Sequence, residues 1–221
     1  MTGHPLVSTL TADVLVAVVR ATDAAGAVRA TEALVAGGVR GIEITYTTPG
    51  AGEAIAALAE RHGEAITLGA GTIRTPEQAA EAVSAGARFL VSPGTQPHLA
   101  EAMRETGAAL LLGALTPSEV MAALDAGADL VKLFPAGLGG PGYLSGLRGP
   151  FPEVAFCPTG GVNPATIPDW LRAGAVALGA GSELCSRALI DARDWDTIER
   201  NARRFADAVA AVAAVTTVAA R

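Results

Sequence analysis

A single lysine, Lys132, stands in the middle of an apolar run and is the first candidate for chemistry. It is the only lysine among the 16 lysine and arginine residues of the chain. Its neighbours Val131 and Leu133 belong to a run with the length and residue types of a buried strand. Apolar surroundings make an ammonium ion costly and favour the neutral amine, which attacks a ketone to form a Schiff base. The alternative is a structural lysine that reaches water or pairs with a carboxylate.

Glu43 is the candidate partner of this lysine. Because side chains alternate along a strand, Glu43 shares one face with Thr45 and Thr47. If this polar face lines the interior of a barrel, Glu43 and Lys132 point into the same lumen. A carboxyl group there could move protons during imine and enamine formation. A purely structural ion pair is the alternative.

Two glycine-rich turns follow the last two apolar runs of the chain. One contains Thr159, Gly160 and Gly161, and the other contains Gly181 and Ser182. We expect each turn to lead into the start of a helix, where backbone N–H groups can bind a phosphate. The alternative is that these turns need glycine only for their backbone geometry.

Further candidates stand at the ends of other predicted strands. Arg20 ends the first, where an arginine could bind a carboxylate through two parallel hydrogen bonds or could simply be solvated. Thr72 offers a hydroxyl after the third strand, and Pro93 forms a rigid turn after the fourth. Cys157 and Cys185 have the character of small core residues.

The composition narrows the class of protein. We expect one domain over residues 1–221, with a core of Ala, Val, Leu and Ile because hydrophobic residues make up 50% and aromatic residues only 4%. A net charge of −6 argues against nucleic acid as a partner. Two cysteines and three scattered histidines offer little for a disulfide framework, a metal site or a Ser-His-Asp triad. The chain has no secretion-type leader pattern and no run of membrane-spanning length, so we expect a cytoplasmic protein without a membrane partner.

The glycines mark a repeat of about 20 to 25 residues. Each marker follows a helix-like run and precedes a strand-like run, as expected of a glycine that caps a helix end. The markers are Gly38, Gly63, Gly86, Gly107, Gly127 and Gly174. The predicted strands are Val14–Val19, Gly41–Tyr46, Ile66–Ala70, Phe89–Ser92, Leu110–Ala114, Leu130–Phe134, Val154–Pro158 and Val176–Gly179. The predicted helices are Ala24–Ala36, Glu53–Arg61, Pro76–Ala85, His98–Thr106, Pro117–Ala126, Tyr143–Leu147, Ala165–Ala173 and Trp195–Ala211.

Eight alternating strand–helix units predict a single (β/α)₈ TIM barrel of the α/β class. A doubly wound open sheet is the alternative, but the near-even spacing favours closure. A short N-terminal helix over Leu6–Thr11 could plug the bottom of the barrel. Active sites of such barrels lie at the carboxyl ends of the strands, which is where the candidate residues gather.

Together these residues resemble the KDPG/KHG aldolase family, whose substrates are 2-keto-3-deoxy-6-phosphogluconate (KDPG) and 4-hydroxy-2-oxoglutarate (KHG). The resemblance runs from the first strand to the last helix. It rests on the stretches GGVRGIEIT, GAGT, VSPG, VKLFP, GPFPEVAFCPTGGV and GAGS. It implies a class I aldolase on a (β/α)₈ barrel that needs neither a metal nor an organic cofactor and is commonly a homotrimer.

The resemblance also implies a role for each candidate. Lys132 would form the Schiff base with pyruvate, and Glu43 would be the acid/base. The implied binding residues are Thr72 and Pro93 at the pyruvate site, Phe134 beside the lysine, Thr159 at the substrate hydroxyls, and Gly160, Gly161, Gly181 and Ser182 at the phosphate. Many members carry a carboxylate-binding arginine where this chain has Thr47, so we assign that role to Arg20.

The implied reaction is the reversible cleavage of KDPG to pyruvate and glyceraldehyde 3-phosphate. KHG or the galacto epimer of KDPG is an alternative substrate for the same chemistry. A different class would be a phosphate-binding barrel isomerase or synthase in which Lys132 acts only electrostatically. A metal-dependent pyruvate aldolase is disfavoured because no carboxylate pair or histidine cluster stands at the strand ends. A non-catalytic descendant is disfavoured because both Lys132 and Glu43 are present.

Overall fold

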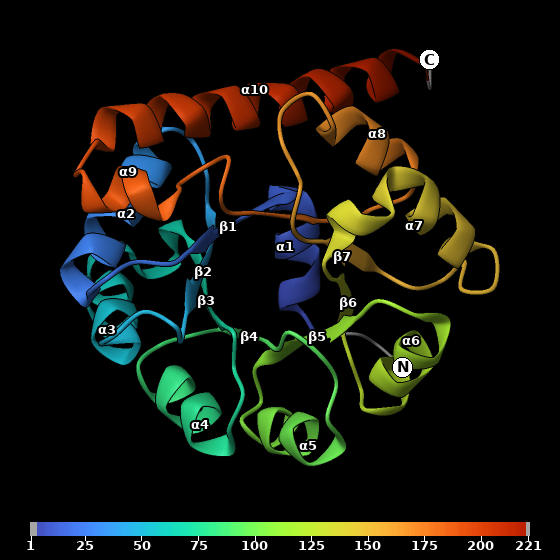
Figure 1. Ribbon diagram of the computed structural model, residues 1–221, viewed down its shortest axis with the longest axis horizontal. Coiled ribbons are helices and arrows are strands. Elements are labelled where there is room, and N and C mark those ends of the chain that lie inside the picture. Colours follow the sequence, from blue (N-terminus) through green and yellow to red (C-terminus); the bar gives the residue numbers. More distant parts are fainter. Residues whose placement is uncertain (1–3, 220–221) are drawn as a thin grey trace.

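The structure is a computed structural model that describes residues 4–219, with side chains up to residue 214. Eight strands lie inside a ring of helices (Figure 1). The strands are β1 Leu15–Val19, β2 Gly41–Thr45, β3 Thr67–Gly71, β4 Phe89–Val91, β5 Ala109–Ala114, β6 Leu130–Leu133, β7 Phe156–Pro158 and β8 Leu178–Ala180. The helices are α1 Leu6–Asp13, α2 Ala24–Ala36, α3 Ala51–His62, η1 Gly63–Ala65, α4 Pro76–Ser84, α5 Pro97–Glu105, α6 Pro117–Asp125, η2 Ala136–Leu138, α7 Gly140–Arg148, α8 Ile167–Arg172, α9 Arg187–Asp191 and α10 Trp195–Ala219.

The strands form one parallel sheet that closes into a barrel. Their order is β7-β6-β5-β4-β3-β2-β1-β8, so every neighbour in sequence is a neighbour in space. The two outermost strands meet through isolated parallel bridges, Phe156 with Ala175 and Thr159 with Gly179. The predicted (β/α)₈ barrel is therefore confirmed, and the open doubly wound sheet is excluded.

Local sequence signals explain where several helices begin. Thr75 accepts a hydrogen bond from the backbone of Gln78 at the start of α4. Thr116 and Glu119 form a capping box at the start of α6. In both helices proline occupies the first turn, where its missing N–H costs nothing. All six glycines that mark the predicted repeat have positive φ angles, between 50° and 111°.

Two helical expectations need correction. Asn163 accepts from the backbone N–H groups of Ala165 and Thr166, as a residue that caps a helix start does, but residues 164–166 form a turn and α8 begins at Ile167, two residues later than predicted. The short helix α9 was not predicted, and α10 extends to Ala219 rather than Ala211. In Figure 1, α10 runs along one side of the barrel, where it packs against α2 and α8.

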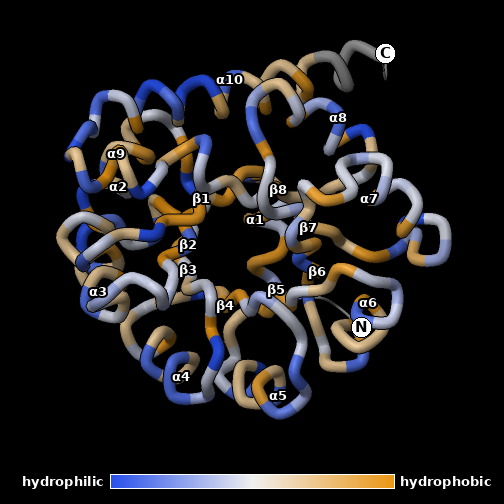
Figure 2. Tube along the Cα trace, viewed as in Figure 1, coloured by the Kyte–Doolittle hydropathy of each residue, from blue (hydrophilic) through white to orange (hydrophobic). Residues whose placement is uncertain are grey.

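The apolar core has two layers separated by the strands. The outer layer fills the space between strands and helices, and the tube of Figure 2 is orange along the strands and bluer toward the outer turns of the helices. The inner layer fills the bottom of the barrel, where Leu6 and Leu10 of α1 pack with Phe89, Leu111 and other lumen residues. The predicted plug is thus confirmed, and it leaves the polar part of the lumen at the opposite end.

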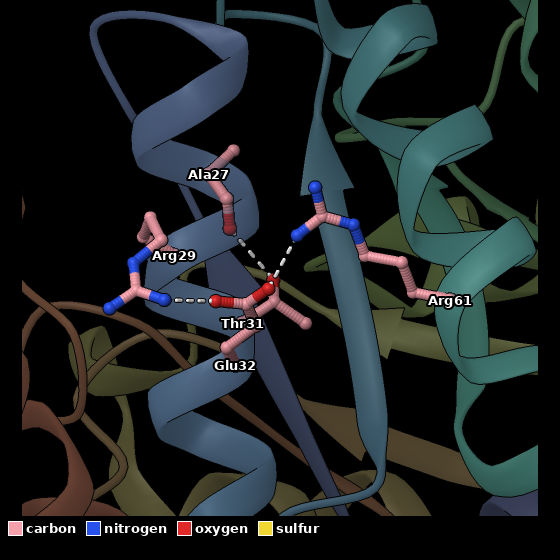
Figure 3. Close-up of polar contacts among 5 residues, drawn as sticks. All are labelled: Ala27, Arg29, Thr31, Glu32 and Arg61. Atoms are coloured by element: carbon pink, nitrogen blue, oxygen red, sulfur yellow. Dashed lines mark hydrogen bonds and ion pairs between the residues drawn. The ribbon is translucent and has the colours of Figure 1, made fainter.

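Surface ion pairs join α2 to α3 on the outside of the barrel. Glu32 accepts from Arg29 and from Arg61, each at 2.6 Å, while Thr31 donates to the carbonyl of Ala27 within α2 (Figure 3). The two arginine side chains are more than half exposed, so each pair contributes at most about 1 kcal/mol. Barrel stability therefore rests on the buried apolar layers.

Candidate active site

A buried ion pair lies in the lumen at the carboxyl end of the strands. Lys132 Nζ, from β6, lies 3.7 Å from Glu43 Oε1, from β2. The two side chains are only 6% and 3% exposed. The expectation that these two residues point into one lumen is met. β2 and β6 are separated by three strands of the sheet, so only barrel closure brings the two side chains together.

The strand register explains why both side chains point inward. Lys132 is two residues after Leu130, which belongs to the inner apolar layer, so both lie on the same face of β6. Its Cα partners on the neighbouring strands are Gly113 of β5 and Cys157 of β7.

Two glycines make room for this arrangement. A methyl group on Gly71 of β3 would lie 1.7 Å from Glu43 Oε1, so the carboxylate occupies the space that a side chain would need. A methyl group on Gly113 would lie 2.2 Å from the carbonyl oxygen of Pro93. Gly113 therefore allows the backbone of Pro93 to lie over the strand beside Lys132. The sequence signal for these two positions was only that of glycine within a strand.

The Glu43 carboxylate is not fully satisfied. Its buried Oε1 has no hydrogen-bond partner among the described residues. Lys132 Nζ lies 5.2 Å from the centre of the Phe134 ring, which is partly exposed beside it. An amine and an unpaired carboxylate oxygen therefore face each other in a site bordered by an aromatic ring, as proton transfer around an imine requires.

The buried thiol of Cys157 lies within the electrostatic field of this pair. Burial raises the pKa of Cys157 to about 12, and the charge of Lys132 partly opposes that rise while Glu43 adds to it. Such a thiol stays protonated at neutral pH, so it is no nucleophile. This agrees with the expectation that Cys157 is a core residue.

A cavity of about 320 Å³ opens beside the ion pair, between the ends of β1, β7 and β8. It brings together seven of the predicted site residues: Arg20, Phe134, Thr159, Gly160, Gly161, Gly181 and Ser182. Thr159 is buried, and Gly179 leaves space for its hydroxyl because a methyl group there would lie 2.3 Å from Thr159 Oγ1.

Three residues that line this cavity have backbone N–H groups without partners among the described residues. Those of Gly161, Gly181 and Ser182 find no backbone or side-chain acceptor among the described residues. Gly160 and Gly161 have φ angles of 93° and 81°, which favour glycine strongly. Neither turn leads directly into a helix as expected: α8 begins at Ile167 and α9 at Arg187. An anion in this cavity would therefore be bound by unpaired backbone N–H groups and not by the N-terminal ends of helices.

Arg20 lies at the mouth, next to the residue that stands where many family members have arginine. Its Nε donates to Thr47 Oγ1 at 2.8 Å. Thr47 shares a hydrogen bond of 3.0 Å with Thr45, which in turn lies 3.0 Å from the carbonyl of Val19. The side chain of Arg20 is therefore held through Nε, and Arg20 also lines the cavity.

Thr72 and Pro93 lie on the other side of the mouth. Thr72 directly follows Gly71 and has a φ angle of 55°, which is uncommon for a residue with a side chain. Such strained backbone often occurs at functional sites. Pro93 lines a second cavity of about 470 Å³, together with Arg74 and Gly94. The structure thus divides the predicted residues between a β3–β4 side and a β7–β8 side, with Lys132 and Glu43 between them.

Other properties of the described region bear on the expected class. Within residues 4–219, no cluster of three or more His, Cys, Asp or Glu residues has an arrangement that could hold a metal ion. No helix in that range is long and apolar enough to cross a membrane.

Three contributors to the site were missed by sequence reasoning. Gly71 and Gly113 shape the lumen, and Arg187 lines the cavity as its second arginine. Arg187 carries no motif signal, and it enters the site through the unpredicted helix α9. Cys185 also lines the cavity, and burial raises its pKa to about 12.

A buried lysine and carboxylate at the mouth of a (β/α)₈ barrel, beside a cavity lined by arginines and glycine turns, are the arrangement expected of a barrel lyase of the imine-forming kind. The model of the family described as "KDPG and KHG aldolase" matches residues 6–201. The chain belongs to this family, and it is therefore an aldolase, a carbon–carbon lyase.

Individual relatives agree with this assignment. The chain is 44% identical to the KHG/KDPG aldolase of Escherichia coli K12 over 178 residues, which cover 80% of this chain and 83% of the relative. A crystal structure of KDPG aldolase from Legionella pneumophila, with pyruvate captured as a covalent carbinolamine, matches with a TM-score of 0.81 and 34% identity over 89% of this chain and 96% of that one. The KDPG aldolase of Zymomonas mobilis ZM4 with 3-phosphoglycerate matches with a TM-score of 0.78 and 32% identity, over 90% and 94% of the two chains.

Proposed function

We propose that the chain reversibly cleaves KDPG to pyruvate and glyceraldehyde 3-phosphate through a Schiff base on Lys132. The observation that carries the proposal is the buried contact of 3.7 Å between Lys132 Nζ and Glu43 Oε1 beside the glycine-lined cavity. A substrate with a keto acid at one end and a phosphate at the other matches this order of groups. The carbinolamine in the Legionella relative and the phosphorylated ligand in the Zymomonas relative support the same substrate class.

The first half of the reaction forms the imine. The amine of Lys132 attacks the C2 ketone and gives a carbinolamine. Glu43 moves the protons that let the C2 hydroxyl leave as water, which yields the iminium ion. Arg20 binds the C1 carboxylate, while Thr72, Pro93 and the Phe134 ring hold the three-carbon unit against the lysine. Because these contacts hold the reacting groups in place, they lower the entropic cost of reaching the transition state.

The second half of the reaction breaks the carbon–carbon bond. The C4 hydroxyl gives its proton to Glu43, the C3–C4 electron pair moves into the iminium ion, and the aldehyde leaves as glyceraldehyde 3-phosphate; Glu43 can later return this proton to C3. Thr159 contacts the substrate hydroxyls, and the N–H groups of the two glycine turns hold the phosphate. The remaining enamine is protonated at C3, and water hydrolyses the resulting imine to release pyruvate and the free amine of Lys132.

Reduction with borohydride in the presence of pyruvate tests this proposal directly. Lys132 is the only lysine, so a reduced pyruvyl adduct has one side-chain candidate, and only the terminal amine competes. We expect intact-mass spectrometry to show one adduct and peptide mapping to place it on Lys132. The matched variant Lys132→Arg should form no adduct and have no aldolase turnover, because a guanidinium group cannot form the imine. If the folded wild-type protein formed no adduct, the Schiff-base proposal would be wrong, and the imine-free isomerase or synthase would become the favoured alternative.

The preference among related substrates needs its own measurement. The Escherichia coli relative carries both KHG and KDPG in its name, so KHG is the second candidate substrate. The cavity with free N–H groups favours a phosphorylated substrate. Retro-aldol rates on KDPG, its galacto epimer and KHG should rank KDPG first.

Assembly and location are part of the proposal. Large apolar side chains are exposed at Met121 and Leu138, 57% and 75% respectively, which would suit burial between subunits of a homotrimer. Light scattering after gel filtration measures the number of subunits, and cell fractionation measures the expected cytoplasmic location.

A further inference from the structure

The cavity beside Lys132 has a charge opposite to that of the chain as a whole. The protein has a net charge of −6. The cavity is lined by two arginines, Arg20 and Arg187, and by no aspartate or glutamate. Because the field inside a cleft lined by one sign of charge concentrates ligands of the other sign, this cavity favours an anionic group.

The two arginines lie at different places along the cavity. Arg20 follows β1 and is tied to Thr47 of the β2–α3 loop. Arg187 is the first residue of α9, next to Ser186, which also lines the cavity. It therefore lies on the β8 side, where the unpaired N–H groups of Gly181 and Ser182 are found.

The guanidinium of Arg187 forms a long ion pair, through Nε, with Asp191 on its own helix. Arg187 Nε lies 3.7 Å from Asp191 Oδ2, which is too long for a good hydrogen bond. The other oxygen of Asp191 accepts from Thr22 Oγ1 at 3.0 Å, so this carboxylate is anchored to the β1–α2 loop. Arg187 is 64% exposed, which leaves its terminal nitrogens free to meet a ligand.

We propose that Arg187 is a specificity-determining residue that binds the phosphate of the substrate and selects phosphorylated 2-keto-3-deoxy acids over their unphosphorylated counterparts. This inference rests on the proposed function. It adds a substrate contact, Arg187, that lies outside the sequence motifs from which the site was predicted. Backbone N–H groups bind the phosphate oxygens by geometry, whereas a guanidinium adds a full charge and planar, paired donors. Backbone N–H groups alone can also bind uncharged hydrogen-bond acceptors. The positive charge of Arg187 is what would favour a phosphate dianion over such groups.

The experiment compares two substrates that differ only in the phosphate, KDPG and 2-keto-3-deoxygluconate. For Arg187→Gln, kcat/KM on KDPG should fall about tenfold, as expected for loss of a hydrogen bond to a charged group in an exposed setting. For the same variant, kcat/KM on 2-keto-3-deoxygluconate should change less than about twofold, because this substrate has no phosphate for Arg187 to bind. Arg187→Lys keeps the charge and should recover part of the KDPG rate. Inorganic phosphate should also inhibit Arg187→Gln more weakly than the wild type.

Arg172→Gln is the matched control. Arg172 is an arginine of similar exposure that pairs with Asp169 on α8, and it does not line this cavity. We expect its substrate ratio to equal that of the wild type. The inference is overturned if Arg187→Gln leaves the KDPG rate intact or lowers both substrates equally, the latter indicating a structural role. Failure of the proposed function is a different result, namely that wild-type protein forms no pyruvate adduct and cleaves neither substrate.

Discussion

Arg20 Nε donates to Thr47 Oγ1 at 2.8 Å, and this bond connects the end of β1 to the loop after β2. Thr47 occupies the position where many members of the family have a carboxylate-binding arginine. Its short side chain leaves space there, and the guanidinium of Arg20 from the neighbouring strand lies against it. We propose that Arg20, from the neighbouring strand, takes the carboxylate-binding role of that arginine.

Arg20→Ala should raise the KM for pyruvate in the condensation direction about tenfold or more, because a hydrogen bond between charged groups contributes roughly 1.5–3 kcal/mol. Thr47→Val keeps the shape but removes the acceptor that orients Arg20. We expect it to have a smaller effect than Arg20→Ala. Steady-state kinetics at saturating aldehyde measures both, and an unchanged KM in Arg20→Ala would remove the carboxylate role.

Glu43→Gln should lower turnover by roughly 10²–10⁴-fold, the usual range for loss of a general acid–base group. The substitution keeps the shape of a side chain whose Oε1 has no hydrogen-bond partner among the described residues. Single-turnover cleavage of KDPG measures the loss. A decrease of less than tenfold would reduce Glu43 to a structural partner of Lys132.

Gly71→Ala should lower turnover by roughly 10²-fold although it leaves Lys132 and Glu43 themselves unsubstituted. The new methyl group would lie 1.7 Å from Glu43 Oε1, and the buried carboxylate would have to move. A displacement of about 1 Å can cost roughly 10²-fold in rate. Gly142→Ala is the control, because a methyl group there would meet no atom within 4 Å. Equal kcat values for the two variants would show that turnover does not depend on the position of the Glu43 carboxylate.

Leu10→Ala should lower the free energy of unfolding by about 2–5 kcal/mol, the usual cost of removing a buried leucine side chain. Leu10 is fully buried in the plug at the bottom of the barrel. Glu60→Ala, at an exposed position of α3, should change stability by no more than about 0.5 kcal/mol. Urea unfolding measures both, and equal midpoints would contradict the plug.

Both cysteines should resist alkylation in the folded protein at pH 8. Burial raises the pKa of Cys157 and of Cys185 to about 12, so their thiolates are scarce at that pH. The unfolded chain loses these protons near pH 9, and the folded chain only near 12. The stabilising effect of these protonated thiols is therefore complete below pH 9 and declines as the pH rises through that window. Mass spectrometry after iodoacetamide treatment should show no label until urea is added, and rapid labelling of the native protein would contradict this.

Much of the fold was accessible from the sequence because its signals are local. Glycine at six helix ends and proline in the first turn of α4 and α6 are set by backbone conformation within a few residues. The strand pattern around Lys132 and Glu43 likewise fixed which face each side chain occupies. The start of α8 was predicted two residues too early, because residues 164–166, which follow the capping side chain of Asn163, form a turn before the helix begins.

Only the tertiary structure decided how the site is assembled. Barrel closure brings Glu43 of β2 within 3.7 Å of Lys132 of β6, although they lie 89 positions apart in the sequence and three strands lie between them. The space made by Gly71 and the second cavity arginine, Arg187, depend on contacts between distant elements. By itself the sequence determined the residue types, the strand faces and the repeat, because those follow from local backbone geometry. Distances and charge within the cavity follow from packing, which no single segment encodes.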